Sequence, residues 1–379
     1  MNRMIYLDNA ATSYYKPKCV LETLAYHSKN SSANAGRGGH ELAIRASSLI
    51  MEARETIADY FGISDPLRIA FGQNTTMALN IGISGLIKDG DHVVISSMEH
   101  NSVSRTVAAK DNVKYTVVMA NEKGYLNPFD VERAIRPNTA LIAINHASNV
   151  TGSVQDIATI GKIAAKHAVP LMVDAAQSAG CIPIDVERMN ISLLAFAGHK
   201  CLMGPLGTGG LYVREDVPIR PILFGGTGSM SESLSMPDFL PDALEAGTVN
   251  APAFAALASG VRFVQKHQSE IREKEAFLTE RLLQGLLNLG SVTLYGNPFH
   301  QNRVGVVSFR IDGKDPAECS NLLSEKHHIA VRAGLHCAAL AHQTIGTAQG
   351  GTIRASVGYF NNASDIDALL LAVKRLGGK

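Results

Sequence analysis

The chain lacks the features that mark nucleic-acid-binding, membrane-bound or secreted proteins. Its 379 residues include 35 Lys and Arg against 34 Asp and Glu, which leaves a formal net charge of +1. Such a balance gives no electrostatic case for nucleic acid or an anionic membrane surface as the main partner. No apolar run is long enough to span a bilayer, and a strand-like segment starts so soon after Met1 that a signal peptide has no room. The sequence therefore predicts a soluble cytoplasmic protein.

Paired cysteines are also missing. The cysteines are odd in number, scattered, and form no Cys-x-x-Cys pair; they are Cys19, Cys181, Cys201, Cys319 and Cys337. This pattern argues against a disulfide scaffold and against a zinc site, and it suits a reducing compartment. We therefore predict a protein without a metal site.

The first two thirds of the chain alternate short apolar runs with helical patterns, and they contain no repeat or low-complexity segment. The runs that predict strands are 67–71, 92–96, 115–119, 140–145, 170–174, 193–197 and 209–213. This alternation predicts an α/β fold, with a mostly parallel seven-stranded sheet that helices cover on both faces. Ligands of such sheets bind beyond the carboxyl ends of the strands. Asn149, Asp174 and Lys200 would meet there.

The last third has a different pattern. Residues 218–252 are rich in Gly, Ser and Pro, and one long helical pattern follows over residues 253–289. The remainder alternates expected strands and helices at 304–310, 316–326, 329–331, 352–356 and 364–376. We predict a large domain over residues 15–252 and a small α+β domain over 253–379 together with 1–14. The loop-rich stretch would cross the active site rather than act as a flexible linker.

Lys200 is the most informative residue. It follows the buried strand 193–197 through Gly198 and His199. A lysine at the mouth of a buried strand loses solvation, which favours the amine as a Schiff-base nucleophile. Pyridoxal phosphate needs such a lysine for its aldehyde and an acidic residue for its pyridine nitrogen, and Asp174 ends another buried strand. For a lone lysine the simpler interpretation is that it ends the strand and extends its ammonium into water. The presence of Asp174 favours a cofactor-binding role for Lys200 instead.

Other polar residues stand between expected strands and helices. Thr75 and Thr76 follow a strand at a helix start, where backbone N–H groups and hydroxyls bind phosphate. His100 follows the strand 92–96, and an imidazole there could stack on a planar ring or move protons. Asn149 offers an amide suited to a phenolic oxygen. Taken singly, each also fits a structural role, such as a helix N-cap or a turn.

Seven motifs occur in one order along almost the whole chain. They are Tyr6-Leu7-Asp8-Asn9-Ala10-Ala11-Thr12, Met98-Glu99-His100, His146-Ala147-Ser148-Asn149-Val150-Thr151-Gly152, Asp174-Ala175-Ala176-Gln177, Gly198-His199-Lys200, Glu245-Ala246-Gly247-Thr248 and Arg332-Ala333-Gly334-Leu335-His336-Cys337. With these motifs the chain resembles the class V aminotransferase family of pyridoxal-phosphate enzymes, specifically its cysteine desulfurase and selenocysteine lyase type. The resemblance implies fold type I and a homodimer with shared active sites.

The resemblance also implies roles for particular residues. Lys200 would hold the cofactor as a Schiff base, and Asp174 would pair with the pyridine nitrogen. His100 would stack on the pyridine ring of the cofactor. Gln177 and Asn149 would contact the oxygen on that ring. Phosphate would be bound by Thr76 and His199, with Thr248 reaching in from the second subunit.

Substrate contacts are implied in the same way. Arg354 would bind the substrate carboxylate, which a guanidinium can hold with two hydrogen bonds, and Asn149 would help; a surface ion pair is the simpler role for such an arginine. Arg37 would come from the partner subunit at the mouth of the site. The chain departs from the family at Ala197, where a serine that binds the phosphate often stands. That contact is then missing or supplied elsewhere, for which Thr75 is the candidate.

The role of Cys337 distinguishes the reactions that the cofactor could support. It follows an expected short strand, with a cation and an imidazole nearby that favour a reactive thiol. The resemblance makes it the nucleophile that takes sulfur from L-cysteine as a persulfide and leaves alanine, with His100 exchanging protons with the substrate thiol. A buried structural cysteine is the simpler alternative. A protein that accepts the sulfur is an implied partner.

Three alternatives remain open. A selenocysteine lyase would share every residue named here and act on L-selenocysteine. The same scaffold could instead run β-elimination or transamination, with Cys337 outside the chemistry. A scaffold or binding protein without cofactor is the third, and the set of Asp174, Lys200 and Arg354 argues against it.

Overall fold

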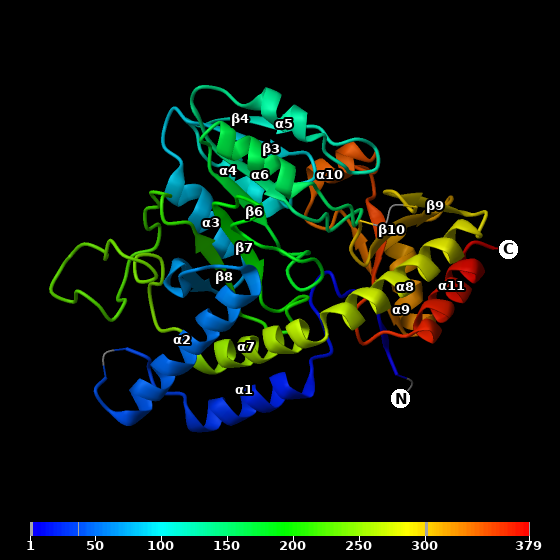
Figure 1. The fold of residues 1–379 in the computed structure, drawn as a ribbon. Coiled ribbons are helices and arrows are strands. Elements are labelled where there is room, and N and C mark those ends of the chain that lie inside the picture. The colour runs from blue at the N-terminus through cyan, green and yellow to red at the C-terminus, as the bar shows by residue number, and fades with distance from the viewer. Residues whose placement is uncertain (1–2, 37, 300–301, 379) are drawn as a thin grey trace.

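A computed structural model describes residues 3–36, 38–299 and 302–378. Within them the large sheet has seven strands in the order β2-β8-β7-β6-β5-β3-β4. In that order, the strands are β2 (Ile69–Gly72), β8 (Gly209–Val213), β7 (Leu193–Ala197), β6 (Leu171–Asp174), β5 (Thr139–Asn145), β3 (His92–Ser96) and β4 (Lys114–Val118). β8 runs antiparallel to both of its neighbours, and the other pairings are parallel. The expected α/β fold with a mostly parallel sheet is thus confirmed (Figure 1).

Helices cover both faces of this sheet, because its central strands are apolar on both sides. One face packs against α3 (Thr75–Leu86) and α4 (Asn101–Ala108). The other face packs against five helices, which are α2 (Glu41–Phe61), α5 (Pro128–Ala134), α6 (Ile157–Lys166), α7 (Ala251–Lys266) and α10 (Ala339–Thr344). Helix α1 (Lys18–Asn30) lies outside α7 (Figure 1).

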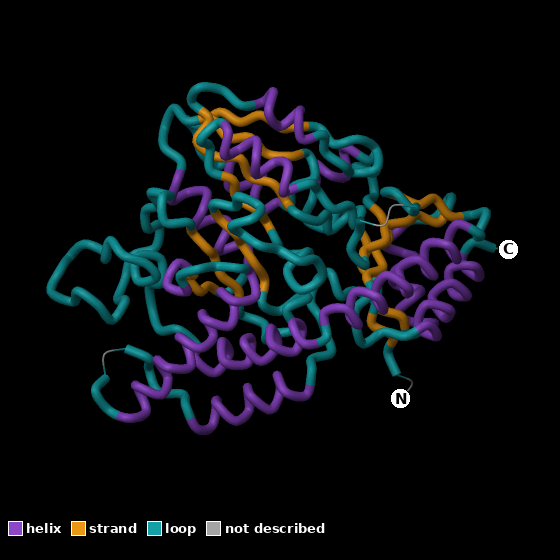
Figure 2. Tube along the Cα trace, in the orientation of Figure 1, coloured by secondary structure: helices purple, strands orange, loops and turns teal. Residues whose placement is uncertain are grey.

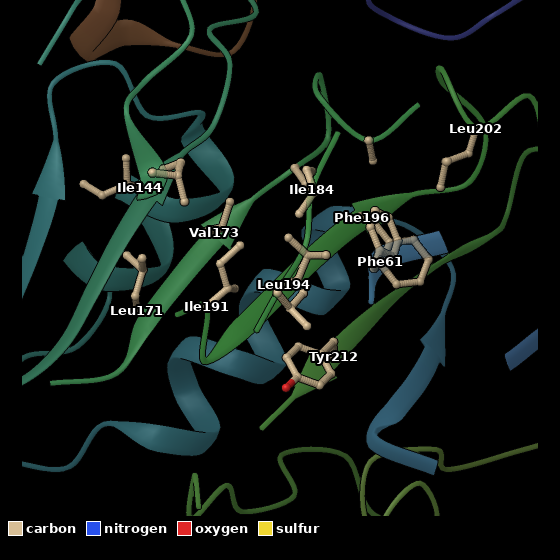
Figure 3. Packing of buried hydrophobic residues seen from close by; sticks show 14 of the residues in the cluster. Phe61, Ile144, Leu171, Val173, Ile184, Ile191, Leu194, Phe196, Leu202 and Tyr212 are labelled. Atoms are coloured by element: carbon tan, nitrogen blue, oxygen red, sulfur yellow. The ribbon is translucent and has the colours of Figure 1, made fainter. Parts of the chain in front are cut away.

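The core on the second face is built from large side chains that alternate along the strands. Leu194 and Phe196 of β7 point to this face, where the rings of Phe196 and Phe61 are 5.6 Å apart (Figure 3). Tyr212 of β8 and Val173 of β6 belong to the same cluster. This packing fixes the carboxyl ends of β6 and β7, where the site residues lie.

A second, smaller sheet has the order β12-β13-β10-β9, and all its pairings are antiparallel. Its strands are β12 (Arg332–Gly334), β13 (Thr352–Ser356), β10 (Val306–Ile311) and β9 (Val292–Tyr295). Near it lie α8 (Gln268–Leu287), α9 (Pro316–His327) and α11 (Ala363–Leu376). β1 (Ile5–Tyr6) pairs with β11 (Ile329–Ala330), so the start of the chain joins this part (Figure 2).

The single helix expected over residues 253–289 is wrong. The chain forms α7 and α8 with a break at His267. α7 buries its apolar face in the core of the large sheet, whereas Leu278, Leu282 and Leu286 of α8 belong to the core of the small sheet. One straight helix could not bury both faces, so the chain turns where the two cores meet.

Smaller differences concern the ends of elements. The strand expected from residue 67 begins at Ile69, after a short 3₁₀ turn over Pro66–Arg68. Residues 218–250, all described, contain no helix or strand, as the composition predicts. None of the described helices is both long and apolar enough to cross a bilayer. The described residues also hold no group of three or more His, Cys, Asp or Glu side chains suited to a metal ion.

Candidate active site

A cavity of about 190 Å³ lies at the carboxyl edge of the large sheet, facing the small sheet. Ten of the residues singled out in the sequence line it, namely Thr75, Thr76, His100, Asn149, Asp174, Gln177, His199, Lys200, Cys337 and Arg354. Thr248 does not line it and is exposed at the surface. Arg37 lies outside the described residues.

Lys200 and Asp174 come from neighbouring strands. β6 ends on Asp174, which pairs in register with Ala195 of β7, and Lys200 follows β7 after a short turn. Burial lowers the pKa of Lys200, the Asp174 carboxylate opposes this shift, and the Arg354 guanidinium adds to it. A lysine with a lowered pKa offers more free amine for attack on a carbonyl.

Hydrogen bonds hold the turn that carries Lys200 on two sides. The Lys200 carbonyl accepts from Ser13 Oγ and from the Met203 N–H, each at 2.9 Å. Gly198 lies so close to the chain before β8 that an added Cβ would meet Thr208 Oγ1 at 2.2 Å. Lys200 therefore extends from a backbone that has little room to move.

The N-terminus of α3 opens onto the cavity. Asn74 caps this helix, accepting from the Met77 N–H at 2.9 Å. Thr76 Oγ1 lies 2.7 Å from Ser102 Oγ, whereas Thr75 Oγ1 is buried and has no hydrogen-bond partner among the described residues. Helix N-termini carry unsatisfied N–H groups and a partial positive charge, so this end of the cavity suits a phosphate.

His100 caps α4 and faces the cavity. Its Nδ1 accepts from the Ser102 N–H at 3.1 Å and lies 2.8 Å from Ser102 Oγ. Burial lowers the pKa of His100, which the nearby Asp174 carboxylate opposes. A neutral His100 with Nδ1 as acceptor carries its proton on Nε2.

Glu99 is fully buried next to His100. Its Oε1 accepts from the Asn145 N–H at 2.9 Å and also bonds Ser96, while Oε2 has no partner among the described residues. Burial raises the pKa of Glu99 to about 8, so this carboxyl is mostly neutral at neutral pH. Because Glu99 is neutral, it adds little negative charge beside Asp174.

Arg354 comes from β13 of the small sheet and is only 1% exposed. Its Nη2 lies 2.8 Å from Asp8 Oδ1, and its Nη1 donates to the Asn149 carbonyl at 3.1 Å. Its Nε has no partner among the described residues. A buried guanidinium at the cavity with a free donor can bind a carboxylate.

Cys337 lies on the loop between β12 and α10 and is exposed. His336 and Cys337 both adopt left-handed backbone conformations, with φ of 49° and 56°. Asn149 Nδ2 donates to the His336 carbonyl and the Asn101 N–H donates to the Cys337 carbonyl, both at 2.7 Å. These bonds tie the loop to the carboxyl edge of the large sheet, over the cavity.

The imidazole beside Cys337 is not a source of positive charge. His336 is buried, its Nε2 lies 3.1 Å from Thr352 Oγ1, and burial lowers its pKa to about 2. The cations that line the cavity with Cys337 are Lys200, Arg332 and Arg354.

Sequence reasoning missed three polar residues of the cavity, which are Asn74, Ser102 and Asn145, whereas Arg332 and His336 belong to the motif that contains Cys337. Asn145 ends β5, so the strand-end pattern that identified Asp174 could have found it. Its Nδ2 donates to the Met98 carbonyl at 3.0 Å, and its Oδ1 has no partner among the described residues. Ser102 gives no comparable signal, because it reaches the cavity only through the fold of α4.

A lysine and an aspartate at neighbouring strand ends, facing a helix N-terminus across one cavity, define the class of pyridoxal-phosphate-dependent enzymes of fold type I. The chain belongs to the class-V aminotransferase family, whose model matches residues 5–369. Members of this family are pyridoxal-phosphate-dependent enzymes.

Curated relatives are similar over almost the whole chain. A probable cysteine desulfurase of Methanothermobacter thermautotrophicus is 35% identical, covering 99% of this chain and 95% of its own. A probable cysteine desulfurase of Pyrococcus abyssi is 33% identical, with coverage of 98% and 94%.

Solved structures are similar in the same way. The apo structure of a cysteine desulfurase from Thermococcus onnurineus is 33% identical with a TM-score of 0.90, covering 99% of this chain and 95% of its own. The cysteine desulfurase CsdA of Escherichia coli, in an S-sulfonic acid form, is 28% identical with a TM-score of 0.84 and coverage of 98% and 94%. The match confirms the fold class expected from the sequence.

Proposed function

We propose that this protein is a pyridoxal-phosphate-dependent cysteine desulfurase, which converts L-cysteine to L-alanine and keeps the sulfur as a persulfide on Cys337. One observation carries the proposal: the exposed Cys337 lines the same cavity as Lys200 and Asp174. Both curated relatives and both solved structures described above are named cysteine desulfurases, which supports it.

The cavity fits the cofactor. The unpartnered Thr75 Oγ1 and the N-terminus of α3 offer donors for a phosphate, together with Thr76 and His199. Across the cavity, Asp174 suits a protonated pyridine nitrogen, and His100, Asn149 and Gln177 suit the ring and its oxygen. Thr75 would replace the phosphate contact that Ala197 cannot make. When bound through Lys200, the cofactor supplies an electron sink that makes the Cα proton of an amino acid acidic.

The protein's own residues then bind, deprotonate and attack. Arg354 binds the substrate carboxylate with its free Nε, which orients Cα toward Lys200. The Lys200 amine takes the Cα proton, which its lowered pKa favours. His100, with its proton on Nε2, donates a hydrogen bond to the substrate sulfur and stabilises the thiolate that remains when the thiol proton leaves to water.

The sulfur transfer takes place at Cys337. Its thiolate attacks the substrate sulfur, so that an S–S bond forms on Cys337 while the substrate C–S bond breaks. The substrate carbon keeps the bonding electrons, takes up a proton and leaves as alanine. The left-handed loop holds Cys337 over the cavity, exposed to solvent, where a sulfur acceptor can also reach the persulfide.

We extend the proposal to partners and location. The enzyme works as a homodimer in which Thr248 and Arg37 serve the neighbouring subunit, and it passes its sulfur to an acceptor protein. The exposure of Thr248, away from the cavity of its own chain, supports the shared site. The five free cysteines support a reducing, cytoplasmic location.

The test is the Cys337→Ala variant of the holoenzyme. It should keep the visible absorbance of the cofactor and its change on adding L-cysteine, because Cys337 acts only after substrate binding. It should form no protein persulfide and release alanine at least about a hundredfold more slowly. A Cys19→Ala variant, which alters a partly buried cysteine on α1, controls for thiol loss and should match the wild type.

The same measurements separate the alternatives. Full alanine release by Cys337→Ala would overturn the persulfide route and favour elimination or transamination. Alanine release from L-selenocysteine alone would favour a lyase, since the weaker carbon–selenium bond breaks more easily. A protein that never shows the cofactor absorbance, even with added pyridoxal phosphate, would be a binding protein.

A further inference from the structure

A second, smaller cavity of about 30 Å³ lies behind the candidate active site, and Ala10 and Gln177 line both cavities. Two thiols, of Cys181 and Cys201, face this second cavity together with the carboxyl of Glu275 from α8. The proposed desulfurase reaction uses none of these three groups.

The two cysteines lie close together. Cys181 and Cys201 pack in one cluster and both line the second cavity. Their backbones are also close: Gly180, with φ of 99°, lies so near that an added Cβ would be 2.4 Å from the Cys201 carbonyl carbon and oxygen. Two chain segments that are distant in sequence therefore meet at their cysteines.

Each of these segments also carries a residue of the active site. Cys201 directly follows Lys200, and Cys181 ends the turn that begins after Asp174 and contains Gln177. Gln177 Nε2 donates to the Ala10 carbonyl at 2.9 Å, which places it between the two cavities. A covalent bond between the cysteines would act on both segments.

The two cysteines differ in environment. Cys181 is buried, and hydrogen bonding to Cys201 together with burial raises the pKa of its thiol well above the usual range. Cys201 is only partly buried and is the more open to a small reagent. Glu275 lines the same cavity, and burial raises its pKa to about 7, so this carboxylate can accept a proton near neutral pH.

We propose that Cys181 and Cys201 are a redox-sensitive pair, which a hydroperoxide oxidises to a disulfide that disables the Lys200 site.

The chemistry balances in two steps. The Cys201 sulfur attacks one peroxide oxygen, so an S–O bond forms and the O–O bond breaks, and the thiol proton leaves with the other oxygen as water. Cys181 then gives its proton to Glu275 and attacks the Cys201 sulfur, which forms the S–S bond. The S–O bond breaks, and its oxygen leaves as a second water with the proton from Glu275. Two thiols lose two electrons in total, and one hydrogen peroxide gains them.

In this proposal the disulfide shifts the backbone that carries Lys200. Bonded sulfurs lie about 2.05 Å apart, well inside the van der Waals separation of two free thiols. The Gly180–Cys201 contact leaves no free space between the two backbones, so the segments can approach only by rotating or shifting. Lys200 is the residue next to the cross-link, and its amine would leave its place beside Asp174.

The experiment uses the Cys337→Ala holoenzyme, so that oxidation of Cys337 cannot mimic the effect. After treatment with hydrogen peroxide and capping of free thiols, a non-reduced tryptic digest should contain residues 167–188 joined to residues 201–214. The joined peptide should weigh about 2 Da less than its two parts. The apparent affinity for pyridoxal phosphate, read from absorbance, should fall about tenfold and recover with dithiothreitol.

Variants in the same background sharpen the result. Cys181→Ser and Cys201→Ser should each abolish the joined peptide and protect cofactor affinity from peroxide, whereas Cys319→Ser, at a buried thiol on α9, should do neither. The proposal would be overturned if, after peroxide treatment, the capping reagent still modified Cys181 and Cys201 completely as free thiols. A joined peptide with unchanged cofactor affinity would show that the disulfide forms but does not disable the Lys200 site. Because the joined peptide is detected by mass, its absence says nothing against the desulfurase reaction.

Discussion

At the scale of single residues, the cavity is marked by polar atoms that the protein itself leaves unpaired. Thr75 Oγ1, Asn145 Oδ1 and Arg354 Nε are all buried and lack partners among the described residues. A buried polar group without a partner costs about 1–3 kcal/mol of stability. With His336 Nδ1, four such groups belong to residues that line one cavity. Under the proposed function a ligand supplies the missing partners, with an anion at Thr75 and a carboxylate at Arg354.

Thr75→Val tests this at the phosphate end. Valine has nearly the shape of threonine, so the variant removes one unpaired hydroxyl and little else. We expect cofactor affinity to fall roughly 10- to 150-fold, because a hydrogen bond to a charged group contributes about 1.5–3 kcal/mol. The cofactor-free protein should be at least as stable in urea as the wild type.

Thr75→Ser is the matched control, since it keeps the hydroxyl and should bind the cofactor nearly as well as the wild type. Absorbance titration with pyridoxal phosphate measures both affinities. Equal affinity in Thr75→Val would show that the phosphate is bound without Thr75. Another group would then have to replace the phosphate contact that Ala197 cannot make.

The sequence identified those residues whose position follows from a strand end. Asp174 ends a strand and Lys200 closely follows one, and parallel strands bring their carboxyl ends to one edge. Arg354 lies within a strand of the other sheet, and only the resemblance to a family indicated it. Ser102 could not be predicted, because its place depends on how α4 packs.

At the scale of elements, the Cys337 loop depends on the strands that flank it. β12 ends at Gly334, and β13 begins after Gly351, whose φ is 67°. An added Cβ at Gly351 would lie 2.2 Å from the Gly334 carbonyl carbon and oxygen. The ends of the two strands thus touch, and this contact sets where the Cys337 loop leaves the sheet.

Gly351→Ala should therefore separate two functions. The added methyl group must push the end of β12 away, and a shift of the Cys337 loop by about 1 Å can reduce a reaction rate by about a hundredfold. Persulfide formation should fall at least tenfold, while cofactor affinity should change less than about threefold, because Lys200, Asp174 and Thr75 lie at the edge of the other sheet.

Gly290→Ala is the control, because nothing lies within 4 Å of a Cβ added at Gly290, in the same part of the chain. Cyanolysis of the persulfide and absorbance of the cofactor measure the two quantities. Wild-type persulfide formation in Gly351→Ala would mean that the loop does not depend on this strand contact.

The strands of the large sheet could be predicted because they follow from local apolar patterns, whereas α1, α4, β9 and α10 were not expected from the sequence. The break between α7 and α8 could not be predicted, since no Gly or Pro marks His267 and the turn results from two separate cores. The boundary between the two domains near residue 252 stays a prediction.

At the scale of the whole molecule, the site lies where two sheets meet. The large sheet contributes Lys200 and Asp174, and the small sheet contributes Arg354 and the loop with Cys337. Thr248 is different, because it is exposed and lies outside the cavity. Glu245 in the same stretch forms a buried ion pair with Arg54 and bonds the Phe71 N–H, so the stretch is fixed to the surface of its own chain.

A residue fixed outside its own cavity can reach a cofactor only in a second copy of the chain. We therefore expect Lys200→Ala and Thr248→Asp to be inactive alone, the first without its amine and the second with a negative charge facing the phosphate. A hybrid dimer would contain one site with an intact Lys200 from one chain and an intact Thr248 from the other. Random exchange of equal amounts should restore about a quarter of wild-type activity.

The control is a mixture of Lys200→Ala with Asp174→Ala. Both residues line the cavity of one chain, so no hybrid can contain an intact site and no activity should return. Native mass spectrometry verifies the hybrids in both mixtures, and alanine release measures activity. If verified hybrids of Lys200→Ala and Thr248→Asp stay inactive, the sites are not shared, and Thr248 needs a role at the surface of its own chain.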